Sequence, residues 1–305
     1  IEVEISALAA GSIALAEPAE LGRARRMLDS VGRYVEFAKS TLPGRMRLDG
    51  LKLVIDCANG AAYRTAPDTL YELGAEVIPL AVNPDGLNIN ESCGATHPQM
   101  MADAVVTHGA DAGICLDGDA DRLIMADEKG KIINGDQILG RLALALHQKD
   151  ELNGGGVVGT VMTNRGLELC LRDAGLTLHR ANVGDRYILE MMRSGGFNLG
   201  GEPSGHILMT NLARSGDGLL TALQMLALMQ QAEQPASQFF NSFAPCPQRL
   251  ENLRDIDPKI LGDQKLQADL AAIEAGMKGD GRVLVRASGT EALIRVMVEA
   301  DTDPL

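Results

Sequence analysis

Short apolar runs alternate with amphipathic stretches through most of the chain. Runs with the length of buried strands lie at residues 51–55, 75–82, 111–116, 157–162, 176–181 and 197–201. Apolar positions recur at helical spacing in the segments 97–108, 138–149, 165–174 and 218–231. Strands that alternate with helices in this way predict largely parallel sheets joined by right-handed crossovers. The turn Asp127-Glu128-Lys129-Gly130 adds a predicted hairpin between strands at 123–125 and 131–133.

Breaks in this pattern divide the chain into four predicted segments. Residues 18–40 have the apolar spacing of an amphipathic helix, so residues 1–45 are predicted to be the tail of an upstream domain and a linker helix. The run Asn153-Gly154-Gly155-Gly156 separates an α/β unit at 46–150 from a second α/β unit at 151–246. A helix at 264–277 and strands at 282–285 and 293–299 predict a small α+β domain over 247–305. The predicted class is therefore α/β, with repeated domains of mixed or parallel sheets and a small α+β C-terminal domain.

Composition narrows the possible partners. The formal net charge of −13 argues against a nucleic-acid partner, because phosphate backbones are bound by concentrated Lys and Arg. A few local arginines can still bind one small anionic substrate. The five cysteines form no zinc pattern, and no apolar run has the length of a membrane span. We therefore expect a cytoplasmic monomer or homodimer with free thiols and no membrane partner.

Both ends of the sequence have an unusual appearance. The chain begins at Ile1 without a methionine or a signal-peptide pattern, and it stops at Leu305 directly after a strand-like run. We expect both ends to be cuts in a longer chain.

The strongest chemical signal is an acidic loop that follows the predicted strand 111–116. Its sequence is Asp117-Gly118-Asp119-Ala120-Asp121-Arg122. Three carboxylates at alternate positions can converge on one hard cation, and ligation by oxygen alone suits Mg²⁺. A solvated acidic loop is the alternative interpretation.

A second polar loop follows the predicted strand 197–201 and contains Glu202, Ser204 and His206. Glu202 and Ser204 offer acceptors and a donor for sugar hydroxyls, and His206 can donate to an oxygen or exchange a proton. The alternative is a turn stabilised by serine and glycine. A weaker cluster is Asp185 with Arg186, where Arg186 can reach substrate or Asp185 can simply cap a helix.

The third loop has the composition of a phosphate cradle. It contains Arg286, Ser288, Gly289 and Thr290, with Arg295 on the strand beyond it. The glycine lets the backbone approach an anion, the hydroxyls donate hydrogen bonds, and the arginines supply bidentate charge. A hairpin turn with ordinary surface arginines is the alternative.

These three loops, in this order, resemble the α-D-phosphohexomutase superfamily. The segments at 54–61, 159–164, 183–187 and 288–299 look most like its phosphoglucosamine mutase branch. The resemblance implies four domains around a cleft, of which this chain holds the end of the first, the second and third, and a truncated fourth. It also implies interconversion of glucosamine 6-phosphate and glucosamine 1-phosphate, on the route to UDP-N-acetylglucosamine and the cell wall.

The resemblance further implies a mechanism. A phosphoserine in the first domain donates its phosphoryl group to the substrate, and the resulting bisphosphate turns around and returns the other one. Asp117, Asp119 and Asp121 would hold Mg²⁺, and Arg122 would assist at the transferring group. Sugar hydroxyls would bind Glu202 and Ser204. The phosphate that is not reacting would bind Arg286, Ser288, Gly289, Thr290 and Arg295.

The sequence departs from the superfamily pattern in one decisive place. The serine loop, roughly Ser/Thr-Ala-Ser-His-Asn-Pro, has no match in the 305 residues, so the chain alone is expected to be inactive. Two alternatives stay open: a phosphomannomutase/phosphoglucomutase, and a non-catalytic fragment that binds sugar phosphates. A phosphatase with an aspartate nucleophile is disfavoured, because such enzymes place the Asp-x-Asp motif after the first strand and lack the other two loops.

Overall fold

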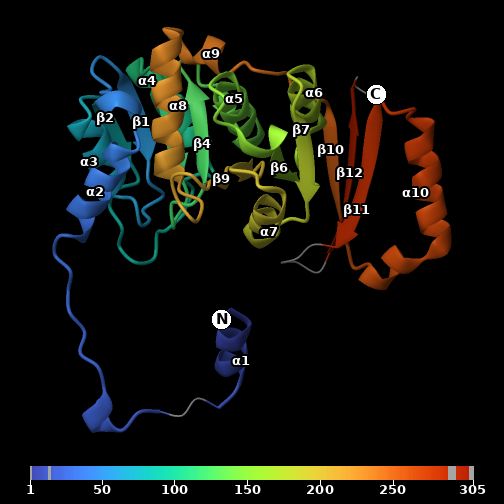
Figure 1. Ribbon diagram of the computed structural model, residues 1–305, viewed down its shortest axis with the longest axis horizontal. Helices are drawn as coiled ribbons and strands as arrows, with labels where there is room; N and C mark the ends of the chain where they lie inside the picture. The colour runs from blue at the N-terminus through green and yellow to red at the C-terminus, as the bar shows by residue number, and fades with distance from the viewer. Residues whose placement is uncertain (1, 13–14, 288–292, 302–305) are drawn as a thin grey trace.

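Two α/β units and a small C-terminal sheet follow one another in the computed structural model, which describes residues 2–12, 15–287 and 293–301 (Figure 1). The first sheet has the strand order β2-β1-β3-β4-β5. Its strands are β1 (Lys52–Asp56), β2 (Glu76–Leu80), β3 (Ala112–Leu116), β4 (Leu123–Asp127) and β5 (Ile132–Ile133). β2, β1 and β3 run parallel, whereas β4 and β5 are antiparallel to their neighbours, so the predicted mixed sheet and its hairpin are confirmed.

Helices cover both faces of this first sheet. Val54 and Cys115 pack with Met101 and Val105 of α4 (Gln99–His108) on one face. The alternate strand positions join a larger core with α3 (Thr65–Glu72) and α8 (Gly218–Ala232) on the other face. Burial on both faces explains why β3 and β4 are apolar runs without polar alternation.

The second sheet has the order β7-β6-β8-β9. Its strands are β6 (Gly156–Thr160), β7 (Thr177–Ala181), β8 (Leu199–Gly201) and β9 (Ile207–Met209), and its helices are α5 (Gly135–Gln148), α6 (Arg165–Asp173) and α7 (Asp185–Gly195). α5 contacts β8 and α6, although it precedes the glycines at 154–156, and α8 contacts β3 and β4 of the first sheet. The two units therefore share one core, and the boundary between 150 and 151 stays a prediction.

The expected helix over residues 18–40 is wrong in its first half. Only α2 (Ser30–Ser40) forms, preceded by a 3₁₀ turn at Pro18–Glu20 and a short helix α1 (Glu2–Ala10). Val35 and Ala38 of α2 are buried, whereas Leu21 and Leu28 are 64% and 86% exposed. Most helical stability comes from packing an apolar face, and Leu21 and Leu28 remain largely uncovered in this chain.

The C-terminal unit is an antiparallel sheet of β10 (Gln248–Arg254), β12 (Leu293–Ala300) and β11 (Gly281–Ala287), flanked by α10 (Gln264–Gly276) and preceded by a short helix α9 (Ala236–Phe239). The predicted strand pair and the helix are confirmed. β10 was not predicted because every residue in it is exposed, which removes the apolar alternation that marks a strand.

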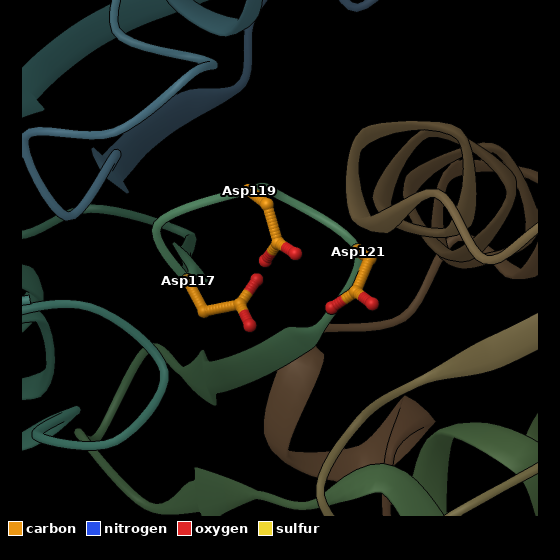
Figure 2. A group of neighbouring side chains, drawn as sticks. All are labelled: Asp117, Asp119 and Asp121. Carbon is orange, nitrogen blue, oxygen red and sulfur yellow. The ribbon is translucent and has the colours of Figure 1, made fainter. Parts of the chain in front are cut away.

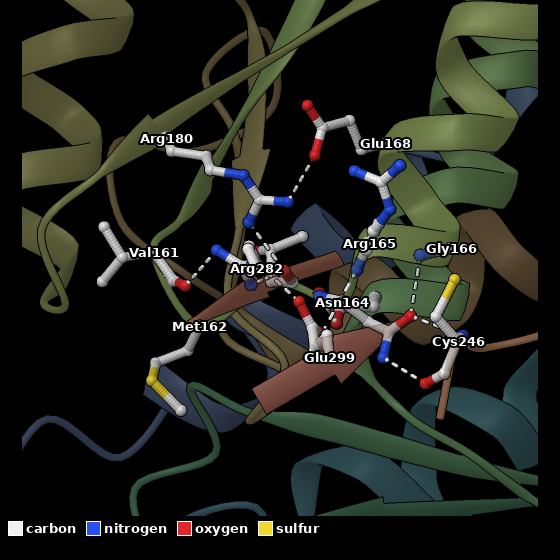
Figure 3. Close-up of polar contacts among 12 residues, drawn as sticks. Val161, Met162, Asn164, Arg165, Gly166, Glu168, Arg180, Cys246, Arg282 and Glu299 are labelled. Atoms are coloured by element: carbon white, nitrogen blue, oxygen red, sulfur yellow. Dashed lines mark hydrogen bonds and ion pairs between the residues drawn. The ribbon is translucent and has the colours of Figure 1, made fainter. Parts of the chain in front are cut away.

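Buried charges attach this sheet to the second unit (Figure 3). The Arg282 guanidinium donates to the carbonyls of Val161 and Thr163 at 2.8 Å each, and it pairs with the fully buried carboxylate of Glu299. Glu299 also accepts a hydrogen bond from the backbone N–H of Arg165, at the first turn of α6. The junction thus places β11 and β12 against the carboxyl end of β6.

Asp136 lies beside this junction and gives a test of its electrostatics. Its side chain is 2% exposed and accepts a hydrogen bond from the Asn164 N–H at 2.8 Å, and burial raises its pKa to about 7. The folded chain therefore holds a proton that the unfolded chain releases near pH 4, so Asp136 destabilises the fold increasingly as pH rises from 4 to 7.

The variant Asp136→Asn should therefore be more stable than the wild type by a margin that grows with pH. The gain in unfolding free energy should rise from about 1–2 kcal/mol at pH 5 to about 2–4 kcal/mol at pH 8. Melting curves of both proteins at the two pH values check this. A difference in stability that does not depend on pH would contradict it.

Candidate active site

Three carboxylates meet in the loop between β3 and β4. One oxygen from each of Asp117, Asp119 and Asp121 lies within 4.8 Å of the others, and Figure 2 shows the side chains turned toward a common space. The loop closes through a hydrogen bond from the Ala120 N–H to the Asp117 carbonyl, with Ala120 in the left-handed region at φ 63°. The curl predicted from the sequence is therefore present.

The electrostatics of this loop suit a cation. Burial, together with the neighbouring charges of Asp121 and Asp119, raises the pKa of Asp117 to about 6, and the hydrogen bond from the Arg122 N–H opposes the rise. Carboxylates this close repel one another when ionised, and a bound divalent cation relieves that repulsion. The donor set contains only oxygen, so the three residues can bind a metal ion of the hard class.

The second loop is joined directly to the first. His206 Nδ1 lies 3.0 Å from a carboxylate oxygen of Asp121, and the backbones of Arg122 and His206 form an antiparallel bridge. The Leu123 N–H donates to the Gly205 carbonyl, and a Cβ at Gly205 would stand 2.1 Å from the Leu123 oxygen. A side chain at this position would collide with the backbone of Leu123. The glycine therefore lets the Ser204-Gly205-His206 turn lie directly against the carboxylate loop.

His206 is buried beside the carboxylate loop, and its acid–base role stays a prediction. Its ring is 6% exposed, and Gly216 packs against it closely enough that a Cβ at that glycine would lie 2.4 Å from the ring. Nε2 has no hydrogen-bond partner among the residues the structure describes. The contact through Nδ1 can orient the Asp121 carboxylate.

Glu202 connects the sugar loop to the loop before α7. One of its oxygens accepts a hydrogen bond from the Gly184 N–H at 3.0 Å, and the other accepts from the Ser204 hydroxyl at 3.3 Å. Asp185 and Arg186 follow at the start of α7 with exposed side chains. The N-cap position is Gly184, and the Asp185 carboxylate accepts a hydrogen bond from the Arg186 N–H at 2.7 Å in the first turn. Both interpretations of this pair stay predictions.

Two arginines face each other where β11 and β12 pair. Arg286 and Arg295 are directly opposite in the antiparallel register. Burial and the charge of Arg295 lower the pKa of Arg286, and the charge of Glu202 opposes them, which places Arg286 near the sugar loop. Paired guanidinium groups are a common basis for phosphate binding. The other predicted members of this loop, Ser288, Gly289 and Thr290, lie outside the described residues.

The sequence interpretation missed one contributor to the site. A cavity of about 270 Å³ beside Asp119 is also lined by Tyr34, Thr65 and Asp217. Asp217 stands between two glycines ahead of α8, and that Gly-Asp-Gly pattern was the available signal.

Comparison with known proteins now identifies the family. Models of phosphoglucomutase/phosphomannomutase domain II, domain III and the C-terminal domain match residues 32–130, 134–246 and 248–305. The phosphoglucosamine mutase of Paracoccus denitrificans is 55% identical over 99% of this chain and 68% of its own length. The chain belongs to the phosphoglucomutase/phosphomannomutase family. The resemblance stated from the three loops is confirmed.

Other relatives agree with this assignment. The phosphoglucosamine mutase of Caulobacter vibrioides is 54% identical over 95% of this chain and 64% of its own length, so the chain spans about two thirds of these relatives. A phosphoglucomutase/phosphomannomutase family protein from Burkholderia thailandensis has a TM-score of 0.75 at 25% identity, over 90% of this chain and 60% of that one. Aspergillus fumigatus N-acetylphosphoglucosamine mutase, solved with GlcNAc-6P and magnesium, has the same fold at a TM-score of 0.69 and 21% identity, over 89% and 66% of the two chains. No helix within the described ranges has the length and apolarity to cross a membrane.

The acidic loop of this family member gives a direct test. Asp119→Asn removes one charged ligand without changing its size, so divalent-metal affinity should fall by about tenfold or more. Mn²⁺ binding measured by electron paramagnetic resonance checks this. Asp68→Asn, which removes an exposed carboxylate on α3, should bind Mn²⁺ like the wild type. Equal losses in the two variants would show that general charge, not the loop, attracts the ion.

Proposed function

We propose that this chain forms the metal-binding and substrate-binding part of a phosphoglucosamine mutase, which interconverts glucosamine 6-phosphate and glucosamine 1-phosphate. The contact between Asp121 and His206 carries the proposal, because it joins the carboxylate loop to the loop that offers sugar contacts. The paired Arg286 and Arg295 supply a phosphate site on the remaining side. Named relatives that are 54% and 55% identical support the choice of amino sugar.

Each residue around the carboxylates would have a separate role in phosphoryl transfer. Mg²⁺ bound by Asp117, Asp119 and Asp121 would neutralise charge on the transferring group. Arg122 holds its guanidinium 3.6 Å from Asp117 and 3.8 Å from Asp121, where it can reach an oxygen of that group. His206 orients Asp121. In the family mechanism the phosphoryl group comes from a phosphoserine and passes through a bisphosphate.

The remaining loops bind the rest of the substrate. Glu202 and Ser204 would contact sugar hydroxyls, with Asp185 and Arg186 at the exposed edge beside them. Arg286 and Arg295, together with Ser288, Gly289 and Thr290, would bind the phosphate that is not reacting. Such a reaction belongs in the cytoplasm and would feed synthesis of UDP-N-acetylglucosamine for the cell wall.

Titration calorimetry with Mg²⁺ present tests the substrate. Glucosamine 6-phosphate should bind more tightly than mannose 6-phosphate, and Arg286→Ala should weaken it by about tenfold or more through loss of a charge-assisted contact. Arg193→Ala, which removes an exposed arginine on α7, is the matched control and should have no effect. Equal affinity for the two sugars would favour a phosphomannomutase/phosphoglucomutase instead.

The source of the phosphoryl group can be tested separately. The 305-residue chain contains no serine loop, so it should bind glucosamine 6-phosphate without converting it. Turnover by this chain alone, followed by phosphorus NMR, would contradict a mechanism through that phosphoserine.

A further inference from the structure

A tyrosine on α2 is bonded to the residue that begins α8. The Tyr34 hydroxyl lies 2.9 Å and 2.8 Å from the two carboxylate oxygens of Asp217. Asp217 is the N-cap of α8, and the same carboxylate accepts a hydrogen bond from the Leu220 N–H at 2.9 Å. Burial and the charge of Asp217 raise the pKa of Tyr34, so its hydroxyl remains a donor at neutral pH.

The residues on either side of Asp217 lie against the carboxylate loop. The Gly218 N–H donates to the Ala120 carbonyl at 2.9 Å, and a Cβ at Gly218 would lie 2.6 Å from the Arg122 oxygen. Gly216 packs on the ring of His206. The short segment 216–218 therefore contacts both loops of the proposed metal site.

Ala120 needs such support. It adopts a left-handed conformation that costs a residue with a side chain free energy, and such conformations persist when the surroundings hold them. Ala120 also lies between Asp119 and Asp121, so its conformation sets the spacing of their carboxylates.

We infer that Tyr34 and Asp217 are positioning residues for the metal loop. Tyr34 holds the Asp217 cap, the cap places the Gly218 N–H, and that N–H holds Ala120 in the conformation that brings Asp119 and Asp121 together. The inference rests on the proposed metal site. If Tyr34 has this role, metal affinity depends on its hydroxyl, although α2 is distant from the metal loop in the sequence.

The same pair of helices offers a matched control. The Gln224 amide of α8 donates to the carbonyl and hydroxyl oxygens of Thr41, at the end of α2, at 3.2 Å each. Gln224 lies in the interior of α8, away from segment 216–218. Thr41→Val therefore weakens the contact between α2 and α8 without touching the metal loop.

Mn²⁺ binding to the 305-residue chain, measured by electron paramagnetic resonance, tests the inference. Tyr34→Phe should weaken binding about three- to tenfold. This is at or below the low end of the loss of about tenfold to hundredfold that follows removal of a residue supporting a metal ligand. Thr41→Val should bind like the wild type even if both variants lower the melting temperature equally. Asp217→Asn, which retains a capping oxygen, should fall between wild type and Asp217→Ala.

Three results would overturn the inference, and they are distinguishable. Unchanged affinity in Tyr34→Phe, or equal losses in Tyr34→Phe and Thr41→Val, would show that Tyr34 only docks α2. Absence of Mn²⁺ binding in the wild-type chain would refute the proposed metal site, and the inference with it.

Discussion

The repulsion among three neighbouring carboxylates is the constraint on which the site depends. Their oxygens lie within 4.8 Å of one another in a loop that is partly withdrawn from water. Several contacts oppose the repulsion: the guanidinium of Arg122, the ring of His206, and the backbone bonds that hold Ala120 and Leu123. The energy stored by holding like charges together favours the binding of a divalent cation.

The loops meet because of how the two sheets are joined. β4 runs antiparallel to β3, and β9 runs antiparallel to β8. The loops that precede β4 and β9 hold Asp121 and His206, and these loops pair through a backbone bridge. α8 then crosses back onto the first sheet and brings Asp217 to the same place. The ion pair and hydrogen bond of Glu299 attach β11 and β12, which contain Arg286 and Arg295, to the second unit.

Much of this could be predicted from local sequence. The buried strands β1, β3 and β6 are continuous apolar runs, and the carboxylate loop is contiguous, so neither requires knowledge of distant contacts. Features set by tertiary packing could not be predicted. The exposed strand β10, the late start of α2 at Ser30 and the pairing of Tyr34 with Asp217 all depend on which segments meet in space.

A crystal structure of the chain with Mn²⁺ and glucosamine 6-phosphate tests the central claim most directly. We predict an anomalous peak among Asp117, Asp119 and Asp121, with sugar hydroxyls at Glu202 and the phosphate at Arg286 and Arg295. A metal bound elsewhere, or a phosphate remote from the two arginines, would contradict it.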